Sequence, residues 1–225
     1  MHPLLENIFW HALSGHHAQY SSGGAQARRY TRGFSPIIAF ADPQRPDFDA
    51  LAPHCEAGEQ LYCDAWSGAA PDGWQVDAES TMFRMVWNAP MPADDAPDAI
   101  ALGPQHAAQA LELATLTRPG PFGIRTIELG EYFGYFEGER LIAMAGERLS
   151  ATGLREVSGI CTHPDFQGQG YARRLALKLI RRQMLRDQLP FLHVMRSNET
   201  AHALYLRMGF AEYKESVVRV VSRPA

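Results

Sequence analysis

The sequence predicts an α/β (α+β) protein built in two parts. Short apolar runs typical of strands alternate with segments whose apolar residues recur at helical spacing. Between the halves lies NAPMPADDAPDA, residues 88–99, a stretch rich in Pro and Asp that has little to bury. We therefore expect a smaller, accessory α/β half at residues 1–97 and a second domain at residues 98–225.

Composition and charge narrow the class of protein. The 225 residues are 46% hydrophobic and 20% charged, and the net charge of -4 gives no reason to expect nucleic acid or an anionic membrane as partner. The first residues lack the basic and apolar regions of a signal peptide, and no apolar run reaches transmembrane length. Three cysteines without a CxxC pair favour reduced thiols over a metal site or disulfide framework. We expect a cytoplasmic protein without a metal.

In the first half, five segments have the pattern of regular structure. The segment ENIFWHALSGHHAQY has apolar residues at helical spacing before a Ser/Gly-rich break. A short helix is indicated by FDALAPHC, and strands are indicated by FSPIIAFAD, EQLYCDAW and STMFRMVWN. This half contains no catalytic constellation.

The second half restarts with a strand, AIALGP, and a helix, QHAAQALELATL. RPGPFGIRTIEL is broken and leaves room for one more helix, and EYFGYFEGERLIAMAGERL indicates two strands joined at a Glu-Gly turn. The remaining elements are a strand in LREVSGICTHP, an amphipathic helix in YARRLALKLIRRQMLRDQ, a strand in PFLHVM, a helix in NETAHALYLRMGF capped by Asn198 and ended by Gly209, and one or two strands in AEYKESVVRVV.

The stretch HPDFQGQGYARR, residues 163–174, places two glycines directly before a helix. A strand, a Gly-rich turn and a helix start bind phosphate, because free N–H groups and the helix dipole face the turn. A P-loop is excluded because no Lys-Ser or Lys-Thr follows, and the dinucleotide pattern GxGxxG fails because Arg173 stands at the third glycine. The pattern [RQ]xxGx[GA] fits in full through Gln167, Gly170 and Ala172.

That pattern is the pyrophosphate loop of the GNAT acetyltransferases, and the chain from about Ala99 to Val221 resembles a GNAT-superfamily N-acetyltransferase domain. The resemblance depends on an ordered set of segments: REVSGICTHPDFQGQGYARRLALKLI, PFLHV and NETAHALYLRMGF. It implies a mixed central sheet flanked by helices, acetyl-CoA as co-substrate and an amine as acceptor. The branch that it resembles most contains the glycine N-acyltransferase-like proteins, which also have an N-terminal half.

The resemblance also implies which residues hold acetyl-CoA. The backbone of the glycine turn binds the pyrophosphate, with Arg173 and Arg174 adding positive charge. In the family, the preceding strand bulges and splays from its neighbour, so that its end hydrogen-bonds the pantetheine arm and the thioester carbonyl through the backbone. Cys161 therefore need not be a nucleophile. The expected contacts are Ile160, Cys161, Thr162, Gln167, Gly168, Gln169, Gly170, Tyr171, Ala172, Arg173 and Asn198.

Acetyl transfer to an amine needs a base, because amines of the lysine type have a pKa near ~10, and it is helped by an acid at the leaving sulfur. Relatives place a base at the positions of Glu156 and His193, and an imidazole suits proton transfer near neutral pH. Tyr205 lies two helical turns after Asn198 on one face of the last helix, and the resemblance places it beside the CoA sulfur as the acid. The alternative for each residue is a role in packing or surface charge.

The sequence thus predicts an acetyl-CoA-dependent N-acetyltransferase in which a primary amine attacks the thioester directly in a ternary complex. A catalytically silent acyl-CoA-binding or sensor module is one alternative, and an acyltransferase moving longer acyl groups to amino acids is another. The N-terminal half either covers the sheet, shapes the acceptor pocket or forms a homodimer contact. The acceptor and the acyl length stay open, because a fold does not fix a substrate.

Overall fold

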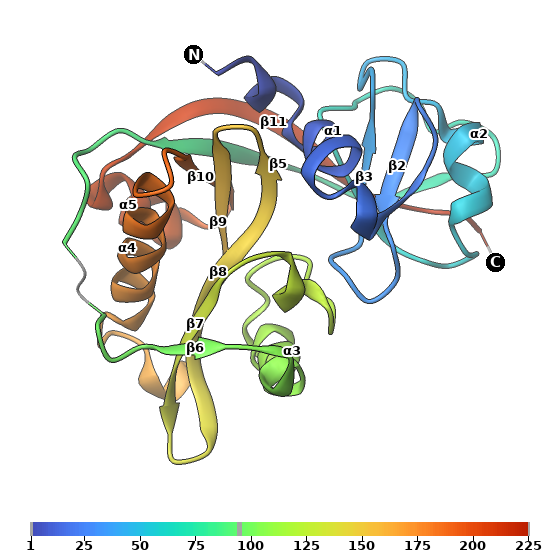
Figure 1. Cartoon of the computed structure of the whole chain (residues 1–225). Helices are drawn as coiled ribbons and strands as arrows, with labels where there is room; N and C mark the ends of the chain where they lie inside the picture. The colour runs from blue at the N-terminus through green and yellow to red at the C-terminus, as the bar shows by residue number, and fades with distance from the viewer. Residues whose placement is uncertain (1, 94–95, 225) are drawn as a thin grey trace.

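The computed structural model describes residues 2–93 and 96–224. In this part of the chain, eleven strands form one mixed sheet in the order β1-β2-β3-β4-β11-β5-β10-β9-β8-β7-β6. Figure 1 shows the blue-to-cyan beginning of the chain at one end of this sheet, while α3, α4 and α5 flank the other end. The predicted α/β (α+β) fold, a mixed central sheet flanked by helices, is confirmed.

Short elements make up the first part of the chain. Helical turns begin at Pro3, include α1 and end at Tyr20, and they are interrupted at Gly15, whose φ and ψ of -113° and -111° are not helical. The elements are α1 (Ile8–His11), β1 (Ser21–Gly23), β2 (Ala27–Tyr30), β3 (Ile37–Phe40), α2 (Phe48–Leu51), β4 (Leu61–Asp64) and β5 (Gln75–Trp87). All five predicted segments are present. The β1–β2 hairpin was not predicted, because β1 is only Ser-Ser-Gly and β2 is Ala-Arg-Arg-Tyr, and strands this short show no clear apolar alternation.

The second part follows the predicted order of elements closely. It contains β6 (Ile100–Leu102), α3 (Ala107–Thr117), β7 (Tyr132–Glu137), β8 (Arg140–Ala151), β9 (Leu154–Thr162), α4 (Tyr171–Met184), β10 (Leu189–Met195), α5 (Glu199–Met208) and β11 (Phe210–Ser222). The broken stretch before β7 forms only a 3-10 turn, Thr126–Leu129. As predicted, Asn198 caps α5 by accepting a hydrogen bond from the Ala201 N–H (3.1 Å), and α5 ends at the left-handed Gly209.

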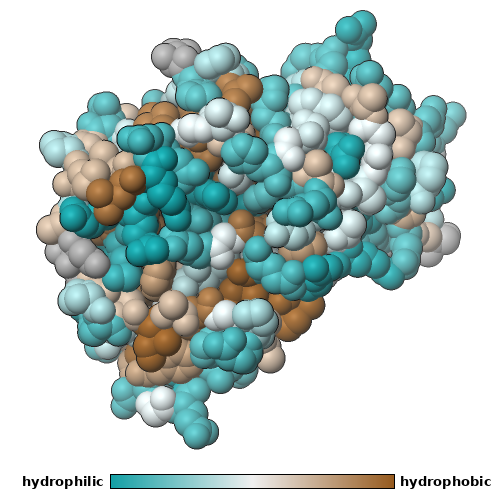
Figure 2. Space-filling model, viewed as in Figure 1, coloured by the Kyte–Doolittle hydropathy of each residue, from teal (hydrophilic) through white to brown (hydrophobic). Residues whose placement is uncertain are grey.

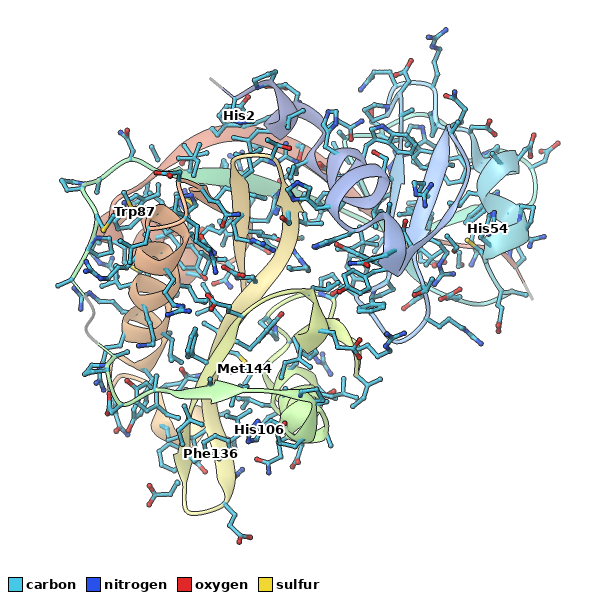
Figure 3. The ribbon with its side chains drawn as sticks, viewed as in Figure 1. His2, His54, Trp87, His106, Phe136 and Met144 are labelled. Carbon is cyan, nitrogen blue, oxygen red and sulfur yellow. The ribbon has the colours of Figure 1, made fainter. Side chains whose placement is uncertain are left out.

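Hydrophobic cores fill both faces of the sheet. On one face, α4 buries Leu175, Ala176, Leu179 and Ile180 against the sheet. On the other face, the helical turns at the start of the chain pack against the middle strands. Figure 3 shows side chains filling the space between ribbon elements, and the labelled His106 and Phe136 contact each other with ring centroids 5.6 Å apart. The face seen in Figure 2 is mainly hydrophilic, with hydrophobic patches of limited extent.

The long strand β5 joins the two parts of the chain. It lies between β10 and β11 and is antiparallel to both, although it precedes residue 97 in the sequence. The two parts therefore share one sheet. The division into residues 1–97 and 98–225 stays a prediction.

The predicted linker at residues 88–99 follows β5, and its residues 94 and 95 lie outside the described residues. Two other residues of this linker are hydrogen-bonded to α4. Lys178 donates to the Ala96 carbonyl (2.9 Å), and Arg181 donates to the Pro92 carbonyl (3.0 Å). Ala96 is fully buried. The stretch therefore buries more than its composition suggested.

The parallel strands β9 and β10 diverge along their length. Within the described chain, their ladder pairs only Leu154–Glu156 with Leu189–Phe191. Further along β9, the register against β8 shifts between Ser158 and Cys161, and Gly159 there has a φ of +61°. This is the bulged and splayed strand that the family resemblance implied.

The packing of α4 predicts a large cost for shortening its buried face. Replacing Leu179, which is fully buried, with alanine should lower the free energy of unfolding by about 2–5 kcal/mol, because a cavity remains. Urea denaturation measures the loss. Leu185→Ala, at the exposed end of the same helix, is the matched control and should change stability little. Equal losses in both variants would contradict this packing.

Candidate active site

The turn between β9 and α4 has the geometry of an anion site. Gly168 and Gly170 have φ values of +78° and +82°, and a Cβ built on either would meet nothing within 4 Å. Glycine is needed here for its backbone conformation, and the space beside it is open. At the start of α4, the N–H groups of residues 171–173 have no intrahelical acceptor. His163 holds the preceding turn by accepting a hydrogen bond from the Asp165 N–H (3.2 Å).

A cavity of about 620 Å³, here called the loop cavity, lies over this turn. Ten of the eleven predicted cofactor contacts line it, and Gln169 is the exception. The ten are Ile160, Cys161, Thr162, Gln167, Gly168, Gly170, Tyr171, Ala172, Arg173 and Asn198. Arg118 and Pro119, which follow α3, line the same cavity. The sequence does not predict them, because a helix end carries no motif that points to a distant turn.

Arg174 differs from the expectation for a phosphate-binding arginine. Its guanidinium pairs with Asp98 (2.8 Å) and stacks over the Tyr135 ring at 5.0 Å. Arg173, in contrast, lines the loop cavity. Only one of the two neighbouring arginines is therefore placed beside the glycine turn.

Cys161 is buried in β9 at the edge of the loop cavity. Burial raises the pKa of its thiol to about 12. The group is a neutral thiol at ordinary pH, which is a poor nucleophile. This agrees with a backbone role for the end of β9.

A second cavity of about 320 Å³, here called the inner cavity, adjoins the loop cavity where β9 and β10 diverge. Both cavities are lined by Ile160, Asn198 and Tyr205, and also by Arg118 at their mouth. Part of the inner lining comes from the first half of the chain, namely Phe9, Ile37, Tyr62 and Met82. The N-terminal half therefore helps to shape this cavity.

Tyr205 lies at the junction of the two cavities. The side chain is 8% exposed, and burial raises the pKa of its hydroxyl to about 12. The hydroxyl therefore stays protonated at neutral pH and is available as a hydrogen-bond donor. Asn198, seven residues earlier, lines the same junction, as the helical spacing predicted.

Both predicted bases belong to a hydrogen-bonded row of buried polar side chains. Arg148 binds the Glu156 carboxylate through Nε (2.9 Å) and Nη2 (2.7 Å). His193 Nδ1 lies 2.8 Å from Glu156 Oε1, and Arg84 Nε donates to His193 Nε2 at 2.9 Å. Because arginine only donates, Nε2 is the acceptor and the imidazole proton lies on Nδ1, where Glu156 accepts it.

The row continues into the first half of the chain. Arg84 Nη2 donates to Asp64 Oδ2 (2.6 Å), and Ser216 Oγ donates to Asp64 Oδ1 (2.6 Å). Six neighbouring strands, β4, β11, β5, β10, β9 and β8, thus contribute one residue each. We call this set the polar row: Asp64, Ser216, Arg84, His193, Glu156 and Arg148.

The polar row fixes the charge state of both predicted bases. Burial alone would raise the pKa of Glu156, but Arg148 and His193 hold it well below its usual range. Burial lowers the pKa of His193, and the hydrogen bond to Glu156 opposes this shift only in part. Glu156 is therefore an ionised, fully engaged carboxylate and His193 a neutral imidazole. The role of base stays a prediction for each.

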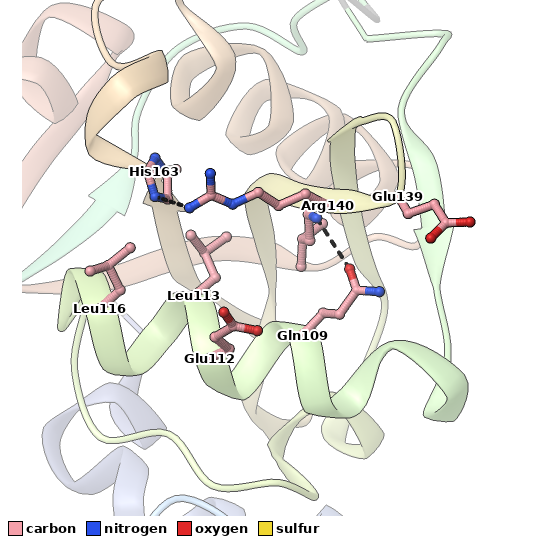
Figure 4. A pocket seen from close by; sticks show the side chains of 8 residues that line it. Gln109, Glu112, Leu113, Leu116, Glu139, Arg140 and His163 are labelled. Atoms are coloured by element: carbon pink, nitrogen blue, oxygen red, sulfur yellow. Dashed lines mark hydrogen bonds between the residues drawn. The ribbon is translucent and has the colours of Figure 1, made fainter.

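A further cavity of about 330 Å³ lies between α3, the β7–β8 turn and the end of β9 (Figure 4). In it, Gln109 accepts a hydrogen bond from the Leu141 N–H (3.1 Å), and Arg140 contacts His163. It shares no lining residue with the loop or inner cavity. We therefore place it outside the candidate active site.

Comparison with known proteins agrees with this geometry. The family model described as FR47-like protein matches residues 132–220, from the start of β7 to β11. A crystal structure from Novosphingobium aromaticivorans, of a protein assigned to the acetyltransferases of the GNAT family, is 30% identical, with 100% of both chains covered and a TM-score of 0.89. The chain belongs to the GNAT superfamily. Its acyltransferase character follows from that membership, while the closer branch stays a prediction.

More distant GNAT structures share the fold alone. A GCN5-related N-acetyltransferase from Kribbella flavida is 15% identical over 97% of this chain and 95% of its own, with a TM-score of 0.62. A GCN5-related N-acetyltransferase-like protein from Streptococcus suis is 16% identical over 96% and 92%, with a TM-score of 0.61. No curated protein matched the sequence.

Two further observations concern membranes and metals. None of the described helices has the length and apolar character needed to cross a membrane. Among the described residues, no three His, Cys, Asp or Glu side chains gather as a metal site would require.

The geometry of the polar row predicts a large loss of stability when one partner of the Arg148–Glu156 ion pair is removed. Arg148→Met should lower the free energy of unfolding by about 3–5 kcal/mol, because Glu156 would remain as a buried charge without its main partner. The double variant with Glu156→Gln should lose less, since no charge is left behind. Urea denaturation compares them, with Arg32→Met in the exposed Arg32–Glu56 pair as the neutral control. A smaller loss in the single than in the double variant would refute the pairing.

Proposed function

We propose that this GNAT protein is an acetyl-CoA-dependent N-acetyltransferase that moves an acetyl group to a primary amine by direct attack in a ternary complex. The observation that carries the proposal is the junction of the loop and inner cavities at Tyr205, Ile160 and Asn198. A cofactor in the loop cavity and an acceptor in the inner cavity would meet there. The N–C bond forms, the C–S bond breaks, the amine proton passes to a base, and the leaving thiolate takes a proton from the acid, Tyr205.

The glycine turn suits the pyrophosphate of coenzyme A. The open space beside Gly168 and Gly170 lets an anion approach the backbone, and the helix start adds N–H donors and partial positive charge. Arg173 and Arg207, which also line the loop cavity, supply full positive charge. Acetyl-CoA brings the activated thioester, and the chain's part is to hold and orient it.

The end of β9 is suited to orienting the carbonyl. Its ladder to β10 stops at Glu156, and the bulge at Gly159 turns the backbone of residues 160–162 along the loop cavity. Backbone N–H groups so placed are fixed dipoles that stabilise a developing oxyanion without reorganising.

Tyr205 is the proposed acid at the sulfur. With a pKa of about 12, its hydroxyl donates a hydrogen bond readily but gives up its proton reluctantly to a thiolate whose ordinary pKa is about 8.5. Its main contribution is therefore hydrogen-bond donation as the C–S bond lengthens. The hydroxyl gives its proton to the sulfur only after the C–S bond has broken.

We assign the role of base, which accepts the proton of the acceptor amine, to His193, and Glu156 is the hydrogen-bond partner of its imidazole. His193 lines the inner cavity, whereas Glu156 does not and is a weak base because of its low pKa. Glu156 stabilises the imidazolium that would form, in the manner of a carboxylate behind a catalytic histidine. Proton transfer requires His193 Nε2 to exchange the hydrogen bond from Arg84 for one from the amine.

A silent acyl-CoA-binding module is the second candidate, and one observation favours it. Both ring nitrogens of His193 and both oxygens of Glu156 are engaged within the protein. Such a module would keep the loop cavity and need no base. Turnover separates the two functions.

Cofactor binding is tested first by a charge change at the turn. Gly170→Asp and Gly170→Asn are nearly equal in size and both tolerate a positive φ, so they differ mainly in charge. Calorimetric titration with acetyl-CoA should show micromolar binding to the wild type, weaker binding to the Asn variant and none to the Asp variant. Equal acetyl-CoA affinity in the two variants would contradict the binding of the pyrophosphate at this turn.

The acid is tested by Tyr205→Phe. We expect kcat to fall by about 10²-fold with little change in acetyl-CoA affinity, because only the hydroxyl is lost. The control is Tyr213→Phe on β11, whose hydroxyl donates to Glu6 (2.6 Å), away from both cavities. Steady-state kinetics and calorimetry provide the two readouts. An unchanged kcat would exclude Tyr205 as the donor.

A further inference from the structure

The lining of the inner cavity carries information about the acceptor that the glycine turn does not. It contains two arginines, Arg118 and Arg148, and no Asp or Glu among the described residues that line it. Its titratable neighbour His193 is neutral. Because Glu156 pairs with Arg148, the charge of Arg118 is left uncompensated, and Arg148 offers the cavity its remaining N–H donors among mostly apolar walls.

Arg118 is an exposed side chain at the mouth of the inner cavity. It follows α3 directly in a left-handed conformation (φ +50°), which is uncommon for a long side chain. Its backbone N–H closes the helix on the Ala114 carbonyl (2.8 Å). Within the described chain, its guanidinium has no hydrogen-bond or ion-pair partner. The charge is thus available to a bound ligand.

Arg148 presents a different edge to the same space. Its side chain is buried, with 9% exposed, and Nε and Nη2 both donate to Glu156. The remaining nitrogen, Nη1, lies 4.0 Å from where a Cβ on Gly120 would stand. Gly120 also lines the inner cavity, and its φ of +143° disfavours any side chain. The glycine keeps the space in front of Nη1 open.

We propose that the acceptor is a small primary amine that also carries a carboxylate and an apolar body, as an apolar amino acid does. The carboxylate would lie between Arg118 and Nη1 of Arg148, which are charge-assisted donors. The apolar body would pack against Phe9, Ile37, Met82 and Val218. This inference rests on the proposed function, because it assigns the inner cavity to the acceptor.

The charge of the cavity also excludes an alternative class and helps the reaction. A polyamine or another polycation would bring further positive charge beside Arg118, whose guanidinium, unlike that of Arg148, has no carboxylate partner among the described residues. For the proposed acceptor, a nearby cation lowers the pKa of the reacting ammonium and raises the share of neutral amine. This matters because both predicted bases are already engaged.

The acceptor class is tested with a matched set: leucine, leucinamide and spermidine, each with acetyl-CoA. We expect kcat/KM for leucine to exceed that for leucinamide by roughly 10- to 100-fold, as befits hydrogen bonds to a charged group. Arg118→Asn, which tolerates the positive φ, should raise the KM for leucine about tenfold more than it raises the KM for leucinamide. Arg118→Lys should restore much of the preference, and Arg45→Asn at a remote, exposed position should have no effect.

Several results would overturn this inference. They are a preference for leucinamide or spermidine, or an Arg118→Asn variant whose KM rises for acetyl-CoA and not for leucine. Calorimetry with N-acetylleucine and N-acetylleucinamide, on protein saturated with coenzyme A, gives a readout that needs no turnover. Preference for the acid supports the carboxylate site even if no amine is acetylated, in which case the proposed function alone fails. Equal or no binding of the two overturns the carboxylate site whatever the turnover.

Discussion

The separation of β9 from β10 is the constraint on which the rest of the site depends. The two strands are parallel neighbours that pair over only three residues of each before they diverge. Backbone groups past that point are free of one neighbour, and the wedge between the strands becomes two connected cavities instead of a closed sheet. A continuous ladder would leave no path from the glycine turn to the inner cavity. The bulge at Gly159 supports the divergence from the β8 side.

The polar row stabilises the sheet beside this opening. One residue from each of six neighbouring strands forms it, from Asp64 on β4 to Arg148 on β8, and its formal charges cancel. Buried charges are tolerated when they are paired and hydrogen-bonded, as these are. The result is a rigid wall in which His193 has one tautomer and Arg148 one remaining free edge. The tautomer of His193 and the orientation of Arg148 therefore depend on hydrogen bonds with residues of neighbouring strands, as far away as Asp64 on β4.

The sequence predicted the elements that depend on local sequence signals. Gly168 and Gly170 need left-handed backbone before a helix, Asn198 is a strong cap, and α4 alternates apolar and charged residues at helical spacing. It could not place Arg84 beside His193 or Arg118 at the cavity mouth, because strand order and helix–loop contacts are long-range properties. It also could not show that the candidate base Glu156 is engaged, since nothing near it in sequence indicates that Arg148, eight residues earlier, binds it. The β1–β2 hairpin was not predicted because its short strands have no clear apolar alternation.

The position of β5 has a consequence for synthesis of the chain. Its residue Val86 pairs with Phe191, 105 positions later, and its other edge pairs with β11, which is made last. A strand so placed leaves the ribosome with both edges unpaired and waits for most of the second part to follow. Closing such long loops is slow, and open strand edges attract other chains. The same insertion that places both parts in one sheet thus leaves an edge of β5 unpaired in the growing chain until its final strand emerges.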